Sequence, residues 1–160
     1  MSHPDATEVD WLTDEEQHVW RSFLALSRGM TTAIDRQLAR DSALSGSEYE
    51  VLVPLSESGT GVVRSRDLLR DLGWERSRLS HLLSRMAKRG LLERLPCDSD
   101  ARGLDVRITP EGRRAIEAAA PAHLGMVRAA LIDQLTPEEM DALRSVSGKV
   151  VPRLTALGLS

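Results

Sequence analysis

The positive charge of this chain gathers on one short segment, residues 76–90, with the sequence RSRLSHLLSRMAKRG. The segment contains five Arg or Lys residues and His81, and it contains no Asp or Glu. Guanidinium and ammonium groups bind phosphate, and Arg also hydrogen-bonds to the edge of guanine, so these residue types favour contact with a nucleic acid. The alternative is an amphipathic surface helix with an ordinary Arg content.

Net charge is distributed unevenly along the 160 residues. The formal charge at pH 7 is −3, but residues 63–114 hold 13 Lys and Arg residues against 8 Asp and Glu residues. Residues 1–62 hold 4 against 11, and residues 115–160 hold 4 against 5. A basic centre between acidic or neutral ends indicates a local contact with a polyanion, although chance clustering of charge on a solvated surface gives the same pattern.

The composition restricts the class of protein. Hydrophobic residues make up 41% of the chain, enough for a core, and aromatic residues only 3%, so aliphatic side chains must fill that core. No continuous apolar run is long enough to cross a bilayer, and the acidic N-terminus lacks the pattern of a signal peptide. With Cys97 as the only cysteine, an internal disulfide framework is excluded. We therefore expect a cytoplasmic protein without a membrane segment.

Helices dominate the predicted structure. Their starts are marked by Ser or Thr caps and their interiors by apolar residues at helical spacing. Thr13 and Ser47, each followed by Glu three residues later, predict two capping boxes. Ser65 is the predicted cap of another helix, which Gly73 ends. The predicted helices cover residues 13–40, 49–55, 66–72, 75–89 and 110–134 and a segment after residue 136.

The basic segment occupies the helix predicted over residues 75–89. One side of this helix is an apolar row at the spacing i, i+3, i+4 and i+7, which consists of Leu79, Leu82, Leu83 and Met86. The period then changes, and residues 91–95 and 104–108 predict two strands of a hairpin with a polar tip at residues 96–103. A short helix, a tight turn, a basic helix and a hairpin in this order are typical of a winged helix-turn-helix.

A helix that enters the major groove buries its apolar side on its own domain and presents donors on the other side. Its N-terminal residues approach the bases most closely. The predicted base contacts are Arg76, Ser77, Arg78 and His81. The same outward faces carry Ser80 and Arg85, and the cations suited to phosphate are Arg64, Arg66, Lys88 and Arg89.

Residues 65–109 resemble the winged-helix core of the MarR family of transcription regulators. Residues 68–73 (LLRDLG) and 82–94 (LLSRMAKRGLLER) look like that family's third and fourth helices. Residues 100–103 (DARG) and 108–112 (ITPEG) look like its wing signature, and the similarity in element order covers about residues 12–155.

The resemblance implies a mainly α fold with a small β-hairpin wing. Residues 45–109 would form the winged helix-turn-helix DNA-binding domain. Residues 13–44 and 110–160 would form a helical dimerisation region, and residues 1–12 a flexible N-terminal segment.

Membership of this family would imply a homodimer that binds a pseudo-palindromic operator in double-stranded DNA. Arg102 in the wing would enter or flank the minor groove, where a guanidinium suits the negative potential. Asp100 would orient that Arg or its loop, or would only form the turn. One departure limits the comparison: Trp74 and Glu75 stand where the family has an aliphatic residue and Ser or Thr, so base preference cannot be transferred. We expect Trp74 to fill the core between the two helices.

The resemblance also implies a small-molecule effector, for which a phenolic or other aromatic compound is the family expectation. Trp20, Tyr49 and His123 could contribute to such a pocket, or each could be a packing residue. Cys97 is a poor candidate for a redox sensor, because it lies beside Asp98 and Asp100 and has no resolving cysteine.

Two other classes of protein fit the sequence less well. An enzyme is disfavoured because the four histidines are scattered and no phosphate loop, paired metal ligands or nucleophile elbow is present. We therefore expect no cofactor and no metal. A winged helix that binds another protein would not need the outward Arg78, His81, Arg85 and Arg102 together.

Overall fold

The computed structural model describes residues 10–96 and 103–158. Cys97, Asp100 and Arg102, and most of the N-terminal segment predicted to be flexible, lie outside the described residues. The chain divides into two compact units, one that ends at Ala33 and one that begins at Ile34. This boundary falls inside the first helix, α1 (Asp14–Asp41).

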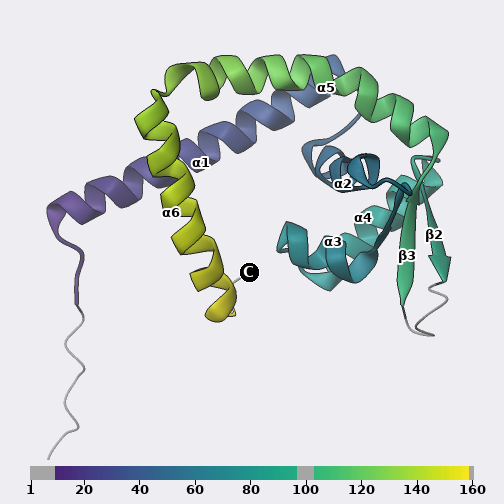
Figure 1. The fold of residues 1–160 in the computed structure, drawn as a ribbon, viewed down its shortest axis with the longest axis horizontal. Coiled ribbons are helices and arrows are strands. Elements are labelled where there is room, and N and C mark those ends of the chain that lie inside the picture. Colours follow the sequence, from purple (N-terminus) through teal and green to yellow (C-terminus); the bar gives the residue numbers. More distant parts are fainter. Residues whose placement is uncertain (1–9, 97–102, 159–160) are drawn as a thin grey trace, which may run out of the picture. The chain divides into compact units, whose positions relative to one another are not determined.

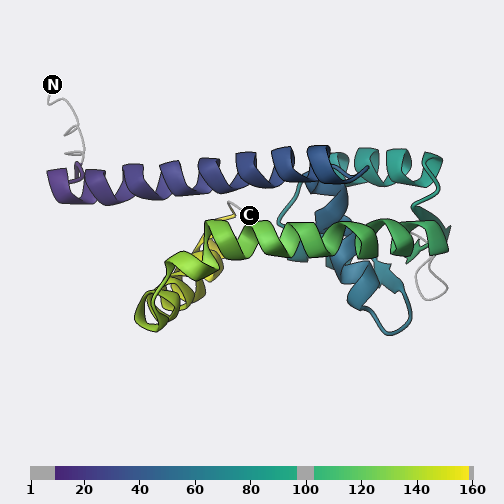
Figure 2. The same ribbon diagram turned by 90° about the horizontal axis from the view of Figure 1, so that it is seen from above.

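A winged helix-turn-helix occupies the middle of the chain, with long helices before and after it (Figure 1). The mainly α fold with a small sheet is confirmed, and most predicted elements lie within three residues of their expected bounds. Figure 2 shows from above how α6 turns away from the end of α5 at a short 3-10 helix. The elements after α1 are α2 (Gly46–Glu57), β1 (Val62–Arg64), α3 (Ser65–Leu72), α4 (Arg76–Lys88), β2 (Leu92–Pro96), β3 (Leu104–Ile108), α5 (Pro110–Ala130), the 3-10 helix (Ile132–Gln134) and α6 (Pro137–Ala156).

The sheet has three antiparallel strands in the order β1-β3-β2, one more than the hairpin that the sequence predicts. β2 and β3 pair with Leu92 opposite Ile108, as expected for the wing. The additional strand, β1, pairs Val63 with Val106 on the other side of β3. A strand of three residues is too short to show the alternation of apolar and polar residues in the sequence. β1 forms because the edge of β3 that does not pair with β2 is free to pair with it.

Two predicted helix caps are wrong. α2 is capped by Ser45 and not by Ser47: Ser45 Oγ accepts a hydrogen bond from the Glu48 N–H, and Glu48 Oε2 accepts one from the Ser45 N–H. Both serines have Glu three residues on, and the helix uses the earlier pair. Ser65 is the first residue of α3, and the cap position belongs to Arg64, whose side chain makes no capping bond. The pairing of Arg64 with Asp105 in the sheet already holds its backbone extended.

Other caps agree with the sequence. Thr13 and Glu16 form the capping box of α1, and Thr136 and Glu139 form that of α6. At the start of α5, Thr109 Oγ1 accepts a hydrogen bond from the Gly112 N–H at 3.0 Å. The same hydroxyl donates to the Gly90 carbonyl at 2.6 Å, which joins α5 to the turn after α4. The wing is thereby anchored at its base by one side chain.

The core is aliphatic, as the composition predicts. It lies in the unit that begins at Ile34 and draws on the end of α1, on α2 to α5 and on the hairpin. The apolar row of α4 points into it, since Leu79, Leu82, Leu83 and Met86 are all buried. The largest fully buried side chains are Leu38, Leu52, Leu55, Leu68, Leu83, Met86, Leu92, Val51 and Val106.

Two other helices expose apolar rows. The exposed large hydrophobic residues of α1 are Val19, Trp20, Phe23 and Leu26. Those of α6 are Leu143, Val146, Val150, Val151 and Leu154. Within α6 none of the residues is buried, so that this helix contributes nothing to the core of its own chain.

One helical segment, Pro110–Gln134, is long and apolar enough to cross a bilayer by length and composition, with a mean hydropathy of 1.2 over its most apolar stretch. The core helices of other proteins meet the same criterion. In this chain Ile116 and Ala119 of the segment are buried in the core. The segment therefore packs on the winged helix-turn-helix along part of its length.

Candidate nucleic-acid interface

A three-residue turn sets the angle between α3 and α4. Gly73 takes a left-handed backbone conformation with φ 62°, and its N–H bonds to carbonyls of the last turn of α3. A Cβ atom disfavours that conformation, which explains glycine here. The Trp74 N–H then donates to the Leu69 carbonyl at 3.3 Å, and α4 begins two residues later at Arg76.

The outward face of α4 has the composition that the sequence predicts. Its polar residues are exposed, whereas its apolar row is buried. Ser84 is half-buried, and its hydroxyl donates back to the Ser80 carbonyl. The predicted contacts on this face that are exposed are Arg76, Ser77, Arg78, Ser80, His81, Arg85 and Lys88. Their contact with DNA stays a prediction.

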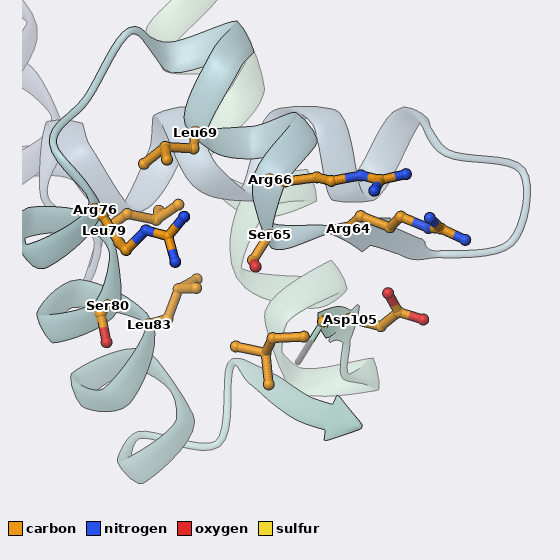
Figure 3. A pocket seen from close by; sticks show the side chains of 11 residues that line it. Arg64, Ser65, Arg66, Leu69, Arg76, Leu79, Ser80, Leu83 and Asp105 are labelled. Atoms are coloured by element: carbon orange, nitrogen blue, oxygen red, sulfur yellow. The ribbon is translucent and has the colours of Figure 1, made fainter. Parts of the chain in front are cut away.

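A hollow of about 390 Å³ lies between α3, α4 and the base of the wing (Figure 3). Three arginines line it, Arg64, Arg66 and Arg76. Its other lining residues are Ser65, Leu69, Leu79, Ser80, Leu83, Gly103, Leu104 and Asp105. The three cations come from three separate elements, and with Asp105 as the one carboxylate among the described residues that line the hollow they give it a net positive charge.

The second hollow, of about 410 Å³, lies where the start of α2 meets α4. It is lined by Ser47, Arg78, His81, Leu82 and Arg85. Arg78 is held at its edge by two contacts. Its guanidinium carbon lies 4.1 Å from the centre of the Trp74 ring, and its Nη2 lies 3.5 Å from Ser47 Oγ.

Several cations of this face have no carboxylate partner in the part of the chain that the structure describes. Among residues 10–96 and 103–158, no carboxylate forms an ion pair with Arg66, Arg76, Arg85 or Lys88. Elsewhere on the surface, Arg114 pairs with Glu111, Arg128 with Asp133 and Arg144 with Asp141. Cations without a carboxylate partner are available to an external anion.

Arg89 differs from its neighbours. The sequence suggests that it suits phosphate, but its guanidinium binds the buried Glu48 carboxylate and the Ala43 carbonyl. Burial alone would raise the pKa of Glu48, yet the Ser45 N–H and the Arg89 charge hold that pKa below its ordinary value. No local pattern could reveal this pair, because its members are 41 residues apart.

Trp74 is half-buried and packs against the core, as expected. The stacking of Arg78 on its ring is not among the contacts predicted from the sequence. The sequence signal for this contact is the four-residue spacing of Trp74 and Arg78, because residues four apart lie on one side of a helix or its first turn.

The proposed effector residues are only partly brought together. The rings of Tyr49 and His123 lie with their centres 4.4 Å apart, and His123 Nδ1 lies 3.2 Å from Gln37 Oε1. Gln37 is buried and came from no sequence pattern. Trp20 belongs to the other compact unit, where it stacks on Phe23. Gln37, Tyr49 and His123 thus join α1, α2 and α5.

This cluster predicts a dependence of stability on pH. Burial lowers the pKa of His123, so the unfolded chain binds a proton more readily at this site than the folded chain does. The contribution of neutral His123 to stability is therefore fully present above the ordinary histidine pKa of about 6.5. This contribution is lost as pH falls through the pKa of His123 in the folded chain. We expect urea unfolding to show a smaller loss of stability between pH 7.5 and 5.5 in His123→Gln than in the wild type. Equal losses in the two proteins would contradict this role.

Comparison with known proteins identifies relatives over nearly the whole chain. A family model described as the transcriptional regulator AbiEi antitoxin matches residues 50–96. AbsC, a MarR family transcriptional regulator from Streptomyces coelicolor, is 36% identical, with a TM-score of 0.88 over 92% of this chain and 99% of that chain. Sco3205, a MarR family transcriptional regulator from the same organism solved in complex with DNA, is 38% identical, with a TM-score of 0.88 over 92% of each chain. The transcriptional regulator PecS from Dickeya dadantii is 28% identical over 81% of this chain and 79% of its own.

Proposed function

The chain belongs to the MarR family of DNA-binding transcription regulators, and from this premise we propose that it is a ligand-responsive repressor. It binds a pseudo-palindromic operator as a homodimer, with α4 in the major groove and residues 96–103 at the minor groove. It acts in the cytoplasm.

The observation that carries this proposal is the exposed face of α4. Its cations lack carboxylate partners among the described residues, and its apolar row is fully used by the core. A groove-reading helix needs this combination, because phosphate contacts supply most of the affinity and base contacts supply the specificity. Arg102 and Asp100 complete the interface in this proposal as the wing contact and its support.

Dimer formation is proposed from the exposed apolar rows of α1 and α6. A helix that contributes no buried residue to its own chain, yet exposes Leu143, Val146 and Val150 at helical spacing, needs another surface to cover it. A second copy satisfies this need and supplies the two related half-site contacts that a palindrome requires. Residues 13–44 and 110–160 are the proposed dimerisation region, and residues 45–109 the DNA-binding domain.

Response to a ligand is proposed from the cluster of Gln37, Tyr49 and His123. These side chains join α1 and α5 of the proposed dimerisation region to α2 of the DNA-binding domain. An aromatic compound that stacks on Tyr49 or His123 would change this junction. The proposed partners are therefore double-stranded DNA, a second copy and a small aromatic effector; Trp20 stays a candidate contact within the first compact unit.

Selection of bound fragments from a random pool of DNA duplexes tests the function directly. We expect a pseudo-palindromic sequence whose affinity falls steeply with salt, because bound cations release counter-ions from DNA. Lys88→Ala removes one phosphate contact per protomer, so the slope of log K against log salt becomes shallower by roughly 2 for the dimer. The matched control, Arg128→Ala, removes a charge that is paired with Asp133 and leaves the slope unchanged.

A folded wild-type protein that selects no duplex at low salt would overturn the proposal. That result would favour the other class considered, a winged helix that binds protein and not DNA.

A further inference from the structure

We propose that Trp74 is a positioning residue that holds the Arg78 guanidinium ready to recognise guanine in the major groove. This inference rests on the proposed function and deepens it, since it names a base and the residue that selects for it. Core packing alone does not explain why one face of the Trp74 ring contacts Arg78 at the start of α4, and this inference does.

The geometry begins with the turn between α3 and α4. Trp74 is half-buried, with part of its side chain packed against the core, and this fixes the ring. The Arg78 guanidinium carbon lies 4.1 Å from the ring centre, within the range of an attractive cation–π contact. Arg78 itself is an exposed residue, so the contact with the indole leaves its side chain accessible to solvent.

Residues of α2 restrict the same guanidinium. Nη2 of Arg78 lies 3.5 Å from Ser47 Oγ, a long hydrogen bond that leaves most of the five N–H donors unused. The charge of Arg78 also acts on Glu50: burial raises the pKa of that carboxyl, and Arg78 opposes the rise. A turn residue and the start of α2 thus confine a side chain that belongs to α4.

Confinement matters because a free Arg side chain loses many rotamers when it binds. A guanidinium already fixed by an aromatic face loses fewer, and its planar fork keeps the paired donors that match O6 and N7 of guanine. The N-terminal part of a groove-reading helix is where such a contact reaches base edges. Arg76 and Arg85 share the outward face, and no aromatic ring holds either of them within the described residues.

A double-mutant cycle on a selected duplex tests the inference. The proteins are the wild type, Trp74→Leu, Arg78→Ala and the double variant, each checked for folding by thermal unfolding. We expect Trp74→Leu to weaken binding about 10-fold when Arg78 is present and less than 2-fold when it is absent, because the cation–π contact acts once in each half-site. Trp74→Phe keeps an aromatic face and should recover part of the loss.

The base is tested with duplexes that carry single base-pair changes through one half-site. Arg78→Ala should abolish the preference for G·C at one position and leave the other positions unchanged. Arg78→Lys keeps the charge and lacks the planar fork of donors. Relative to Arg78→Ala, it should therefore recover more of the affinity than of the preference for G·C.

An equal effect of Trp74→Leu with and without Arg78 would overturn the inference, because it would reduce Trp74 to a packing residue. A preference pattern that Arg78→Ala leaves intact would overturn it as well. If Trp74→Leu does not fold, Trp74→Phe in the two Arg78 backgrounds gives the comparison with a smaller expected difference, because part of the aromatic contact remains. A wild type that selects no duplex is a different result, since it defeats the proposed function itself.

Discussion

Val146→Asp is expected to convert the proposed dimer into a monomer and to weaken operator binding by more than roughly 100-fold. The wild-type Val146 side chain is 54% exposed in the single chain and lies in the apolar row of α6. A carboxylate at this position would be buried without a partner when a second copy covers the row, which costs several kcal/mol. Each monomer then contacts only one half-site. Affinity falls because binding of one DNA-binding domain no longer raises the effective concentration of the second at the other half-site.

Ser145→Asp is the matched control for this variant. It introduces the same charge one residue earlier, on the side of α6 that faces away from the apolar row. Light scattering should give a dimer mass for this control and a monomer mass for Val146→Asp, and fluorescence anisotropy with the selected duplex should give the affinities. A dimeric Val146→Asp with wild-type affinity would show that α6 does not close the dimer.

The second large effect concerns stability. Gly112→Ala should lower the free energy of unfolding by about 3 kcal/mol, because the added Cβ would lie 2.0 Å from the Leu91 carbonyl oxygen. That oxygen is backbone and accepts a hydrogen bond from the Thr109 N–H, so it cannot move without disturbing the junction of wing and helix. Chemical denaturation of the purified variant gives the measurement.

Another glycine of α5 supplies the control. A Cβ added at Gly125 would meet no side chain or neighbouring segment within 4 Å, so Gly125→Ala should keep or slightly raise stability through its higher helix propensity. Equal stabilities for the two alanine variants would contradict the close approach of α5 to Leu91. The contrast also explains the glycine of the wing signature at residues 108–112: it lets the first turn of α5 touch the start of the hairpin.

The parts of the fold that follow from local sequence were predictable. The apolar row of α4, the Gly73 turn and the strand alternation of β3 are each contained in a few consecutive residues. The site was predictable to the same extent, since helical spacing alone assigns Arg76 and His81 to the exposed face.

The missed features depend on contacts between distant segments. β1 forms only because β3 is available to pair with it, and the capping box uses Ser45 and not Ser47, with a Glu48 side chain that also binds Arg89 of a distant segment. The pairing of Arg89 with Glu48 removes one cation from a run that looks uniform in sequence. Composition and periodicity describe one element at a time, whereas the pairing of β1, the cap of α2 and the Glu48–Arg89 pair depend on contacts between elements.

The Glu48–Arg89 pair has a mechanical consequence. Glu48 belongs to the capping box that Ser45 opens at the start of α2, and Arg89 is the C-cap residue of α4, so their ion pair joins the first turn of one helix to the end of the other. The neighbouring Tyr49 rests on His123 of α5. A continuous series of contacts thus runs from α5 through the start of α2 to the end of α4, and we expect a ligand that displaces the His123 ring to change the orientation of α4.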